Sequence, residues 1–217
     1  MGWIAGIINA IVALVTMMLA GTAASVSQTP DGELTADALR RGGYVIFIRH
    51  AAADQGTDAN GFTLADCSTQ RNLGQSGIAD AETIGRNVRQ QRIPIGDVLS
   101  SEFCRARDTA RLAFGRAQAA PNLNLCCQDG SGLTDGQRQD YLLQALAARP
   151  RPATNTILVG HGSFMMTDLA MGEAAVYAPD GNGGTTRIAR ILPDEWANEA
   201  YRSGTPSPDA PRLAPNP

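Results

Sequence analysis

The sequence predicts an α/β fold, a three-layer sandwich in which a mainly parallel central sheet lies between helices. Two continuous apolar runs, residues 44–48 and 156–159, have the length and the β-branched content of strands that are buried on both faces. Segments of helix length with an apolar stripe alternate with these and other short strands. Such alternation is typical of a parallel sheet whose strands are connected by helices.

Each helix is indicated by an apolar stripe, and several are also marked by a residue that begins or ends them. Gly42-Gly43 and Gly115 are expected to end the first and third helices, because glycine readily adopts the conformations found there. Ser101 is expected to cap the third helix, and Thr134 with Gln137 forms a capping box for the fourth. The helices are expected over 34–41, 76–90, 101–114, 134–149 and 164–171, with stripes that include Ile78, Ala81, Ile84 and Val88 in the second and Phe103, Ala106, Ala110 and Phe114 in the third.

The remaining strands complete the expected sheet. A strand over 97–100 leads into the third helix. Two further strands, over about 174–178 and 186–192, flank a turn rich in Asp, Gly and Asn, which is typical of a hairpin. All of these elements fall within residues 34–202, which we expect to form one domain without internal repeats.

Both ends of the chain differ in composition from this domain. Residues 1–30 contain no Asp, Glu, Lys or Arg, and their apolar run is followed by small residues. This pattern is typical of an export signal over residues 1–25, so we expect a periplasmic or secreted protein. The alternative is a membrane anchor over residues 3–21, because the run approaches the ~20 residues that span a bilayer. Residues 203–217, which include five prolines, are expected to be disordered.

Four cysteines, Cys67, Cys104, Cys126 and Cys127, fit an oxidising compartment. They allow three pairings in two bonds, and a bond between the neighbours Cys126 and Cys127 would be strained. The sequence therefore favours the two arrangements in which Cys67 and Cys104 each pair with one of these neighbours, and it does not choose between them.

The composition excludes several classes of function. All 18 basic residues are arginine, which excludes a Schiff-base lysine and the lysine of a P-loop. The two histidines, His50 and His161, are too few for a zinc finger or an H-E-x-x-H metal site, and we expect neither a metal nor a cofactor. A formal charge of −3 gives no reason to expect nucleic-acid binding. The membrane would be contacted only through the amino-terminal segment.

Both histidines follow a buried strand, His50 after 44–48 and His161 after 156–159. Because the carboxyl ends of parallel strands form one edge where ligands bind, we expect the two rings to face each other across one crevice. Arg49 lies beside His50, and Arg105 lies in the first turn of the helix that follows the strand over 97–100 and opens on the same edge. Each residue alone is more often structural. Two imidazoles, two guanidinium groups and helix amino termini at one edge are nevertheless typical of a phosphate site.

At these motifs the chain resembles the histidine phosphatase superfamily, whose fold is phosphoglycerate mutase-like. The resemblance spans about residues 44–192 and is carried by Ile48-Arg49-His50, by Ser100-Ser101-Glu102-Phe103-Cys104-Arg105-Ala106 and by Val159-Gly160-His161-Gly162, in that order. Residues 67–73 and 172–176 are similar to exported bacterial members related to lipopolysaccharide core heptose phosphatases. The resemblance implies a phosphoglycerate mutase-like α/β domain and a metal-independent phosphatase.

The resemblance also implies a mechanism. His50 would attack phosphorus and form a phosphohistidine, which water then hydrolyses. Arg49, Arg105 and His161 would bind the phosphoryl oxygens and neutralise their charge. Arg71 would help to bind the substrate, although a salt bridge with the acidic loop around it explains this arginine equally well. The implied activity is that of an exported phosphomonoesterase acting on a small-molecule or glycan phosphate ester.

The motifs leave open which residue would protonate the leaving oxygen. Many members place a glutamate after the third strand, where this chain has Asp129 out of register, and others place an aspartate directly after the second histidine, where it has Gly162. Glu173 is the first choice, because an antiparallel strand that starts there would begin beside His161. Asp168 is weaker, since it lies about 10 Å along a helix from that histidine. A chain without the acid would be restricted to good leaving groups.

A second interpretation is a catalytically weak module of the same fold that binds phosphate or a phosphoglycan, and the unsettled acid favours it. A mutase is disfavoured, because exported compartments contain little sugar-phosphate metabolism. A serine hydrolase is disfavoured as well, because the sequence around Ser163 does not fit G-x-S-x-G.

Overall fold

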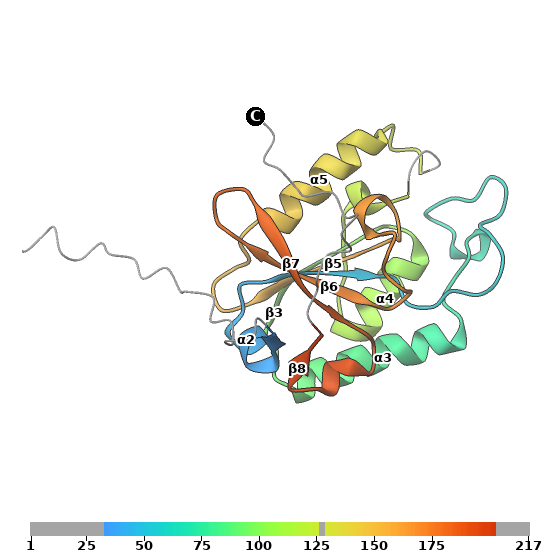
Figure 1. Cartoon of the computed structure of the whole chain (residues 1–217). Coiled ribbons are helices and arrows are strands. Elements are labelled where there is room, and N and C mark those ends of the chain that lie inside the picture. Colours follow the sequence, from blue (N-terminus) through green and yellow to red (C-terminus); the bar gives the residue numbers. More distant parts are fainter. Residues whose placement is uncertain (1–32, 126–128, 203–217) are drawn as a thin grey trace, which may run out of the picture.

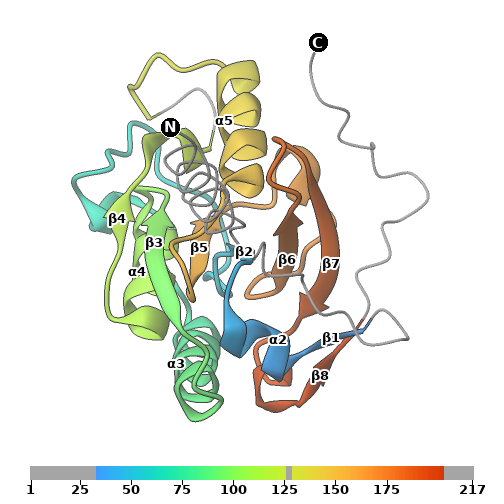
Figure 2. The same ribbon diagram turned by 90° about the vertical axis from the view of Figure 1, so that its left-hand side faces the viewer.

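The computed structural model describes residues 33–125 and 129–202, and its centre is a mixed six-stranded sheet (Figure 1). The strand order is β4-β3-β5-β2-β6-β7, which Figure 2 shows from β4 on the left to β7 on the right. This order places the two strands that were predicted from continuous apolar runs, β2 and β5, side by side. The strands are β2 (Val45–Arg49), β3 (Ile95–Ser100), β4 (Gln118–Ala119), β5 (Asn155–Gly160), β6 (Ala174–Pro179) and β7 (Thr185–Ile191).

The sheet is parallel from β4 to β2 and antiparallel from β2 to β7. The predicted hairpin is therefore β6–β7. In the register of the sheet, Ile48 of β2 pairs with Val159 of β5 and with Ala174 of β6. Because β6 runs in the opposite direction, it begins at the same edge where β2 and β5 end. The segments that follow β2 and β5 and the segment that precedes β6 consequently meet at one edge.

Helices cover both faces of the sheet, which gives the three layers predicted from the sequence. Figures 1 and 2 show α5 on one face and α3 with α4 on the opposite face, and Figure 2 shows a small sheet of β1 and β8 next to α2. The helices are α2 (Ala36–Arg41), α3 (Gln75–Gln90), α4 (Cys104–Phe114) and α5 (Asp135–Ala147), the small sheet is β1 (Leu34–Thr35) and β8 (Ala200–Tyr201), and the 3₁₀ turns are η1 (Cys67–Thr69), η2 (Pro121–Leu123), η3 (Phe164–Met166) and η4 (Glu195–Ala197).

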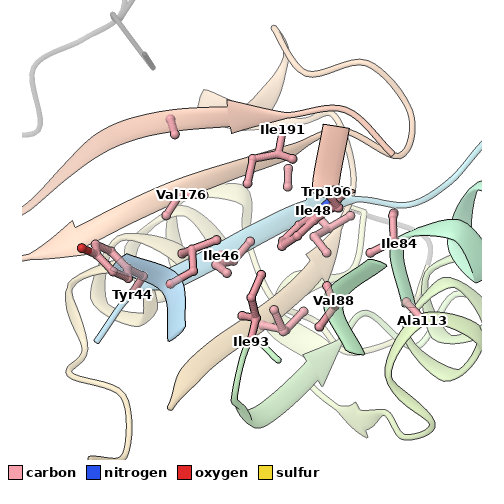
Figure 3. Close-up of a cluster of buried hydrophobic side chains, with 14 of the residues drawn as sticks. Tyr44, Ile46, Ile48, Ile84, Val88, Ile93, Ala113, Val176, Ile191 and Trp196 are labelled. Carbon is pink, nitrogen blue, oxygen red and sulfur yellow. The ribbon is translucent and has the colours of Figure 1, made fainter. Parts of the chain in front are cut away.

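The two hydrophobic cores lie on opposite faces of the sheet, because successive side chains of a strand point to opposite sides. From β2, Ile46 and Ile48 enter the first core, and Val45 and Phe47 enter the second. Burying one such side chain contributes about 2 kcal/mol relative to leaving it exposed. Figure 3 shows the first core, whose members around β2 include Ile84, Val88, Val176, Ile191 and Trp196. The second core lies under α5 and includes Leu142, Leu146, Leu158 and Tyr177.

Two predicted helix ends are confirmed. The capping box of α5 is present, since the Gln137 N–H donates to Thr134 Oγ1 at 3.3 Å and the Thr134 N–H donates to Gln137 Oε1 at 2.8 Å. α4 ends at Gly115, whose φ of 73° is in the left-handed region that glycine adopts without strain.

Three expectations about helices were wrong. α4 begins at Cys104 rather than after Ser101, whose hydroxyl contacts His161 instead. The segment 164–171 forms only the short turn η3, because the antiparallel β6 starts at the edge where β5 ends and no crossover helix is needed. Ile78 is 40 % exposed, because the first turn of α3 packs through Gly77, where a Cβ would lie 2.0 Å from the Ala52 carbonyl oxygen.

Cys67 and Cys104 form a disulfide bond, with their Cα atoms 5.8 Å apart. The expectation that each of them pairs with Cys126 or Cys127 is therefore wrong. Strain in a bond between neighbouring cysteines does not determine the partners of Cys67 and Cys104, because tertiary proximity brings these two together. Cys126 and Cys127 lie outside the described residues. The bond ties η1, in the loop after β2, to the first residue of α4.

The expected export signal, the alternative anchor and the proline-rich tail also lie outside the described residues. Within the described ranges, no helix combines the length and the apolar character that crossing a membrane requires.

Candidate active site

His50 directly follows β2, and its imidazole is buried at the edge where β2 and β5 end. Its backbone N–H donates to the Gly160 carbonyl oxygen at 2.9 Å, which extends the pairing of the two strands by one residue. The ring Nδ1 lies 2.8 Å from the Ala51 carbonyl oxygen. Because a carbonyl oxygen only accepts hydrogen bonds, Nδ1 carries the proton and Nε2 of the neutral ring keeps its lone pair. Nε2 is therefore the ring nitrogen of His50 whose lone pair is available for bonding.

His161 follows β5, and its ring faces that of His50. The ring centroids are 5.2 Å apart, the planes are inclined by 67°, and each residue is 3 % exposed. The rings meet although they are distant in sequence, because Arg49 at the end of β2 is in register with Gly160 at the end of β5. At this separation, neighbouring oxygens of one phosphoryl group can reach both rings.

Arg105 extends from the first turn of α4 and is 1 % exposed. Its Nη1 donates to Asp58 Oδ1 at 2.9 Å and to the Arg71 carbonyl oxygen at 3.2 Å, and its Nη2 donates to Asp58 Oδ2 at 3.4 Å. A guanidinium group has five N–H donors. These contacts leave the Nε–H and one Nη2–H, which lie on one edge of the group and form a fork for an anion.

Arg49 is the last residue of β2, and its guanidinium group lies against Gly162. Its Nη1 donates to the Leu169 carbonyl oxygen at 2.7 Å. A Cβ at position 162 would come within 2.8 Å of Arg49 Cζ and Nε, so a side chain there would displace the guanidinium group. This gives a steric reason for glycine at the position where some members of the resembled superfamily have an aspartate.

Three buried nitrogen atoms at this edge have no hydrogen-bond partner among the described residues, namely Arg49 Nε, Arg105 Nε and His161 Nδ1. A buried polar atom left unpaired costs about 1–3 kcal/mol. Other unpaired atoms occur elsewhere in the described fold, but these three belong to side chains gathered around His50. N–H donors on two cations beside an imidazole are the groups that a bound oxyanion would satisfy.

Burial and nearby positive charge lower the pKa values of both histidines. Burial is the main cause that lowers the pKa of His50 to about 4. The positive charges of three nearby arginines lower this pKa further, whereas the hydrogen bond with the Ala51 carbonyl oxygen raises it. The pKa of His161 falls well below its usual value, first because of burial and then because of His50 and the same arginines. Both rings are therefore neutral near pH 7, as an attacking imidazole must be. The three arginines, whose charges act on both rings, are Arg105, Arg49 and Arg71.

These pKa shifts predict that the stability of the fold depends on pH. An unfolded histidine has a pKa of about 6.5, so below that pH the unfolded state binds protons that the folded state does not. The free energy of unfolding should fall between about pH 6.5 and 4, by up to about 3 kcal/mol for His50 alone. Urea titrations near pH 7.5 and 4.5 would measure this fall. The double variant His50→Asn/His161→Asn should show a smaller fall, and an equal fall would contradict the prediction.

An open cavity of about 510 Å³ adjoins the histidine pair. Phe103 connects the two, because its ring lies 5.1 Å from the His161 ring and 4.6 Å from Arg105 Cζ. The cavity combines aromatic rings with two carboxylates, which suits a leaving group larger than the phosphoryl group itself. Its lining consists of Asp58, Phe62, Phe103, Leu125, Asp135, Ser163 and Phe164.

Glu173 lies next to β2, but its carboxylate is bound by Arg190. Oε1 accepts from Arg190 Nε at 2.7 Å, and Oε2 accepts from Arg190 Nη2 at 2.6 Å and from the Ala170 N–H at 2.9 Å. The Glu173 carbonyl oxygen accepts from the Arg49 N–H at 3.1 Å. In all three of these bonds the carboxylate is the acceptor, and two of them come from one guanidinium group. These contacts argue against the expectation that Glu173 is the general acid.

The two weaker candidates for the acid are also engaged elsewhere. Burial alone would raise the pKa of Asp129, but hydrogen bonds from Asn124, Arg138 and Ser131 lower it to about 2. Asp168 is paired with two arginines of β7. None of the three carboxylates considered from the sequence is therefore placed as a proton donor to a group bound at the histidine pair.

The structure brings together four residues predicted from the motifs, and it adds two that the sequence analysis did not single out. Asp58 orients Arg105, and Asn124 contacts the Ser101 hydroxyl, which lies 2.9 Å from His161 Nε2. Both lie in loops whose path no periodicity predicts. The sequence signal that could have found Asp58 and Asn124 is their place in loops that follow β2 and β4, at the edge of the sheet that carries the histidines.

Within 33–125 and 129–202, no three His, Cys, Asp or Glu side chains are grouped in a way that could hold a metal ion. No protein-family model and no curated protein matches the chain.

Several solved structures that resemble the chain are phosphatases by name. One is a protein histidine phosphatase, SixA, complexed with tungstate, at 19 % identity and a TM-score of 0.49, covering 69 % of this chain and 97 % of that one. Another is a phosphoserine phosphatase from Entamoeba histolytica in complex with 3-phosphoglyceric acid, at 13 % identity and a TM-score of 0.48, covering 68 % and 95 %. A third is an alpha-ribazole phosphatase from Shigella flexneri, at 15 % identity and a TM-score of 0.42, covering 66 % and 94 %.

Proposed function

We propose that the protein is a phosphomonoesterase that works through a phosphohistidine on His50. One observation carries the proposal, namely that buried nitrogen atoms of Arg49, Arg105 and His161 have no hydrogen-bond partner among the described residues, while these side chains act on or contact the His50 ring. The N–H groups of the two guanidinium cations can donate to the oxygens of a phosphoryl group, and the imidazole of His161 contacts the His50 ring beside them. Burial and the nearby arginine charges keep the His50 imidazole neutral near pH 7, and the same arginines would neutralise the negative charge of the substrate.

In the first step, His50 Nε2 attacks phosphorus in line with the leaving oxygen. An N–P bond forms, the P–O bond to the leaving group breaks, and the leaving oxygen takes a proton from solvent. Arg49, Arg105 and His161 hold the three remaining oxygens, so positioning and charge stabilisation supply most of the acceleration. In the second step, water attacks the phosphohistidine, the N–P bond breaks, and inorganic phosphate leaves with Nε2 restored.

The contacts of the acidic residues indicate which esters this site would favour. Because Glu173, Asp129 and Asp168 are all engaged with arginines, protonation of the leaving oxygen would receive little help from them. Esters whose leaving group departs as a stable anion should therefore react fastest. The aromatic rings in the adjoining cavity would contact such a group, and Arg71 would add positive charge near the phosphoryl oxygens.

Export and the natural substrate belong to the proposal as well. The composition of residues 1–25 supports an exported enzyme, with membrane contact only if that segment stays attached. The similarity of residues 67–73 and 172–176 to heptose phosphatases makes a phosphorylated glycan the first natural substrate to test. Neither a metal nor a cofactor takes part in the proposed steps.

The test is to trap the intermediate. Brief exposure to a ³²P-labelled aryl phosphate should leave a label that is lost in acid and kept in base, since phosphohistidine has this stability. Peptide mapping should place the label on His50, and the second histidine, His161, is an internal control. Turnover without any label on His50, or an acid-stable label on a hydroxyl, would remove the proposal.

The second candidate function is a module that binds phosphate or a phosphoglycan without turnover. The engagement of all three candidate acids favours it specifically. In that case inorganic phosphate should bind, Arg105→Ala should weaken this binding, and no phosphoester from an aryl-to-sugar panel should be hydrolysed.

A further inference from the structure

The Ser101 hydroxyl lies between His161 and a buried amide. Ser101 Oγ is 2.9 Å from His161 Nε2, 2.9 Å from Asn124 Oδ1 and 3.3 Å from the Phe103 backbone nitrogen, which donates to it. A hydroxyl group has one hydrogen to donate and two lone pairs that accept. Whether that hydrogen goes to Asn124 or to His161 therefore fixes which ring nitrogen of His161 carries its proton.

The orientation of the Asn124 amide decides the question. The Glu102 N–H donates to Asn124 Oδ1 at 2.7 Å, so this atom must be the acceptor. Asn124 Nδ2 donates to Glu102 Oε2 at 3.0 Å and to Asp129 Oδ2 at 2.9 Å, and carboxylate oxygens can only accept from it. In the reverse orientation, the amide NH₂ group would face the Glu102 N–H, so two donors would meet. The amide oxygen would then face the carboxylates of Glu102 and Asp129, so acceptors would meet as well.

Once the orientation of the Asn124 amide is fixed, the hydrogen bonds allow only one position for the proton on the His161 ring. Asn124 Oδ1 accepts the Ser101 hydrogen, so Ser101 Oγ can only accept from His161, and His161 Nε2 must carry a proton. His161 Nδ1 is then the unprotonated nitrogen of the neutral ring, and it is the buried atom that has no partner among the described residues. His50 has the opposite tautomer, with its proton on Nδ1.

We propose that Ser101 and Asn124 are positioning residues that hold His161 in its Nε2–H tautomer and present Nδ1 to the phosphoryl group. This inference rests on the proposed function for the identity of the ligand. When an ester binds as its monoanion, the proton that it carries passes to Nδ1, and the imidazolium donates that hydrogen back to a phosphoryl oxygen. In this transfer the O–H bond of the monoanion breaks and an N–H bond forms at Nδ1. The total charge of the ester and the ring stays the same.

The chain of bonds beyond Ser101 stabilises the imidazolium. It ends at the carboxylates of Glu102 and Asp129, and Asp129 is itself held by Arg138 at 2.7 Å. These negative groups are connected to His161 through Nε2, whereas the proposal assigns the phosphoryl oxygens to Nδ1. The groups that oppose protonation of His161 are His50 and the three arginines, Arg49, Arg71 and Arg105, and a bound dianion would offset their charge.

The test uses the fact that the chain has two histidines. Labelling with ¹⁵N-histidine gives ring signals from His50 and His161 alone, and the variant His50→Asn assigns them. Without substrate near pH 7.5, the nitrogen shifts should show His161 protonated at Nε2 and His50 protonated at Nδ1. Adding inorganic phosphate should convert His161 to the imidazolium at a higher pH than in the free protein.

Two variants test the role of the chain of bonds. In Ser101→Ala, His161 should no longer be held in one tautomer. In Asn124→Ala, the Ser101 hydroxyl is free to donate to Nε2, so the Nδ1–H tautomer should dominate. Ser100→Ala is the matched control, because the Ser100 hydroxyl donates to the Ser101 carbonyl oxygen at 2.8 Å rather than to the ring of His161. It should leave both histidine signals unchanged.

Kinetics provide the second readout. For an aryl phosphate, Ser101→Ala should lower kcat by about 10- to 100-fold with little change in KM, and it should move the alkaline limb of the pH profile to lower pH. A purely structural role would lower the amount of folded protein without moving that limb. An Nδ1–H tautomer of His161 in the unmodified protein, or an unchanged tautomer in Ser101→Ala, would overturn the inference. Because the tautomers are read without turnover, an inactive protein with the expected tautomers would count against the phosphatase proposal alone.

Discussion

Replacing His50 with alanine should lower kcat/KM for an aryl phosphate by about 10⁴-fold or more. The reason is that both proposed steps pass through the bond between Nε2 and phosphorus, which cannot form without the His50 ring. The ring is neutral near pH 7 and is held by one backbone carbonyl oxygen, so its removal takes away one hydrogen bond and leaves a small cavity. Steady-state kinetics of the purified variant would measure the loss.

Binding of inorganic phosphate is the control for this variant. The unpaired nitrogens of Arg49 and Arg105 stay in place in His50→Ala, so phosphate should still bind and stabilise the fold against heat. A variant that binds phosphate but has lost turnover separates the nucleophile from the binding site. Hydrolysis that survives His50→Ala at an undiminished rate would show that the phosphohistidine mechanism is wrong.

Replacing Arg105 with lysine should lower kcat/KM by about 10²- to 10³-fold, the second-largest effect that we expect. Charge is retained, so the change tests geometry. A lysine ammonium is a single point of charge and cannot contact Asp58 while it offers a two-donor fork to a phosphoryl group. Kinetics with an aryl phosphate, together with the affinity for inorganic phosphate, would measure how much of the loss lies in binding.

Arg111→Lys is the matched control, since Arg111 is an exposed residue in the last turn of the same helix. It should leave the kinetics unchanged. Asp58→Asn should lower activity less than Arg105→Lys, because the amide can still accept from the guanidinium group. The expectation fails if Arg105→Lys keeps activity within about threefold of the unmodified protein, a difference below 1 kcal/mol in transition-state binding.

The prediction of the sheet from the sequence succeeded because it used local information. Continuous apolar runs mark strands that are buried on both faces, and β2 and β5 are such strands at the centre of the sheet. Once they are parallel neighbours, His50 and His161 must meet at the edge where both end. The short strands β1, β4 and β8 were not predicted, because two residues are too few to show a period.

The predictions that failed depended on loops. The partner of Cys67 and the true start of α4 are each set by a segment that connects elements and has no periodic pattern. Ser101 illustrates the reason, since its position before an apolar stripe is typical of a helix cap, yet its hydroxyl bonds an imidazole sixty residues away. A local preference gives way when a tertiary partner offers a better hydrogen bond.

By itself, the sequence determined that this chain builds an α/β sheet with two imidazoles and two guanidinium groups at one edge, because strand length, apolar pattern and residue order are properties of neighbouring residues. Only the tertiary structure decided which nitrogen of each histidine carries its proton, which N–H groups of Arg105 stay free, and which carboxylates are already bound by arginines. Those outcomes depend on distances between residues far apart in the chain, and hydrogen bonding is settled over a few tenths of an ångström.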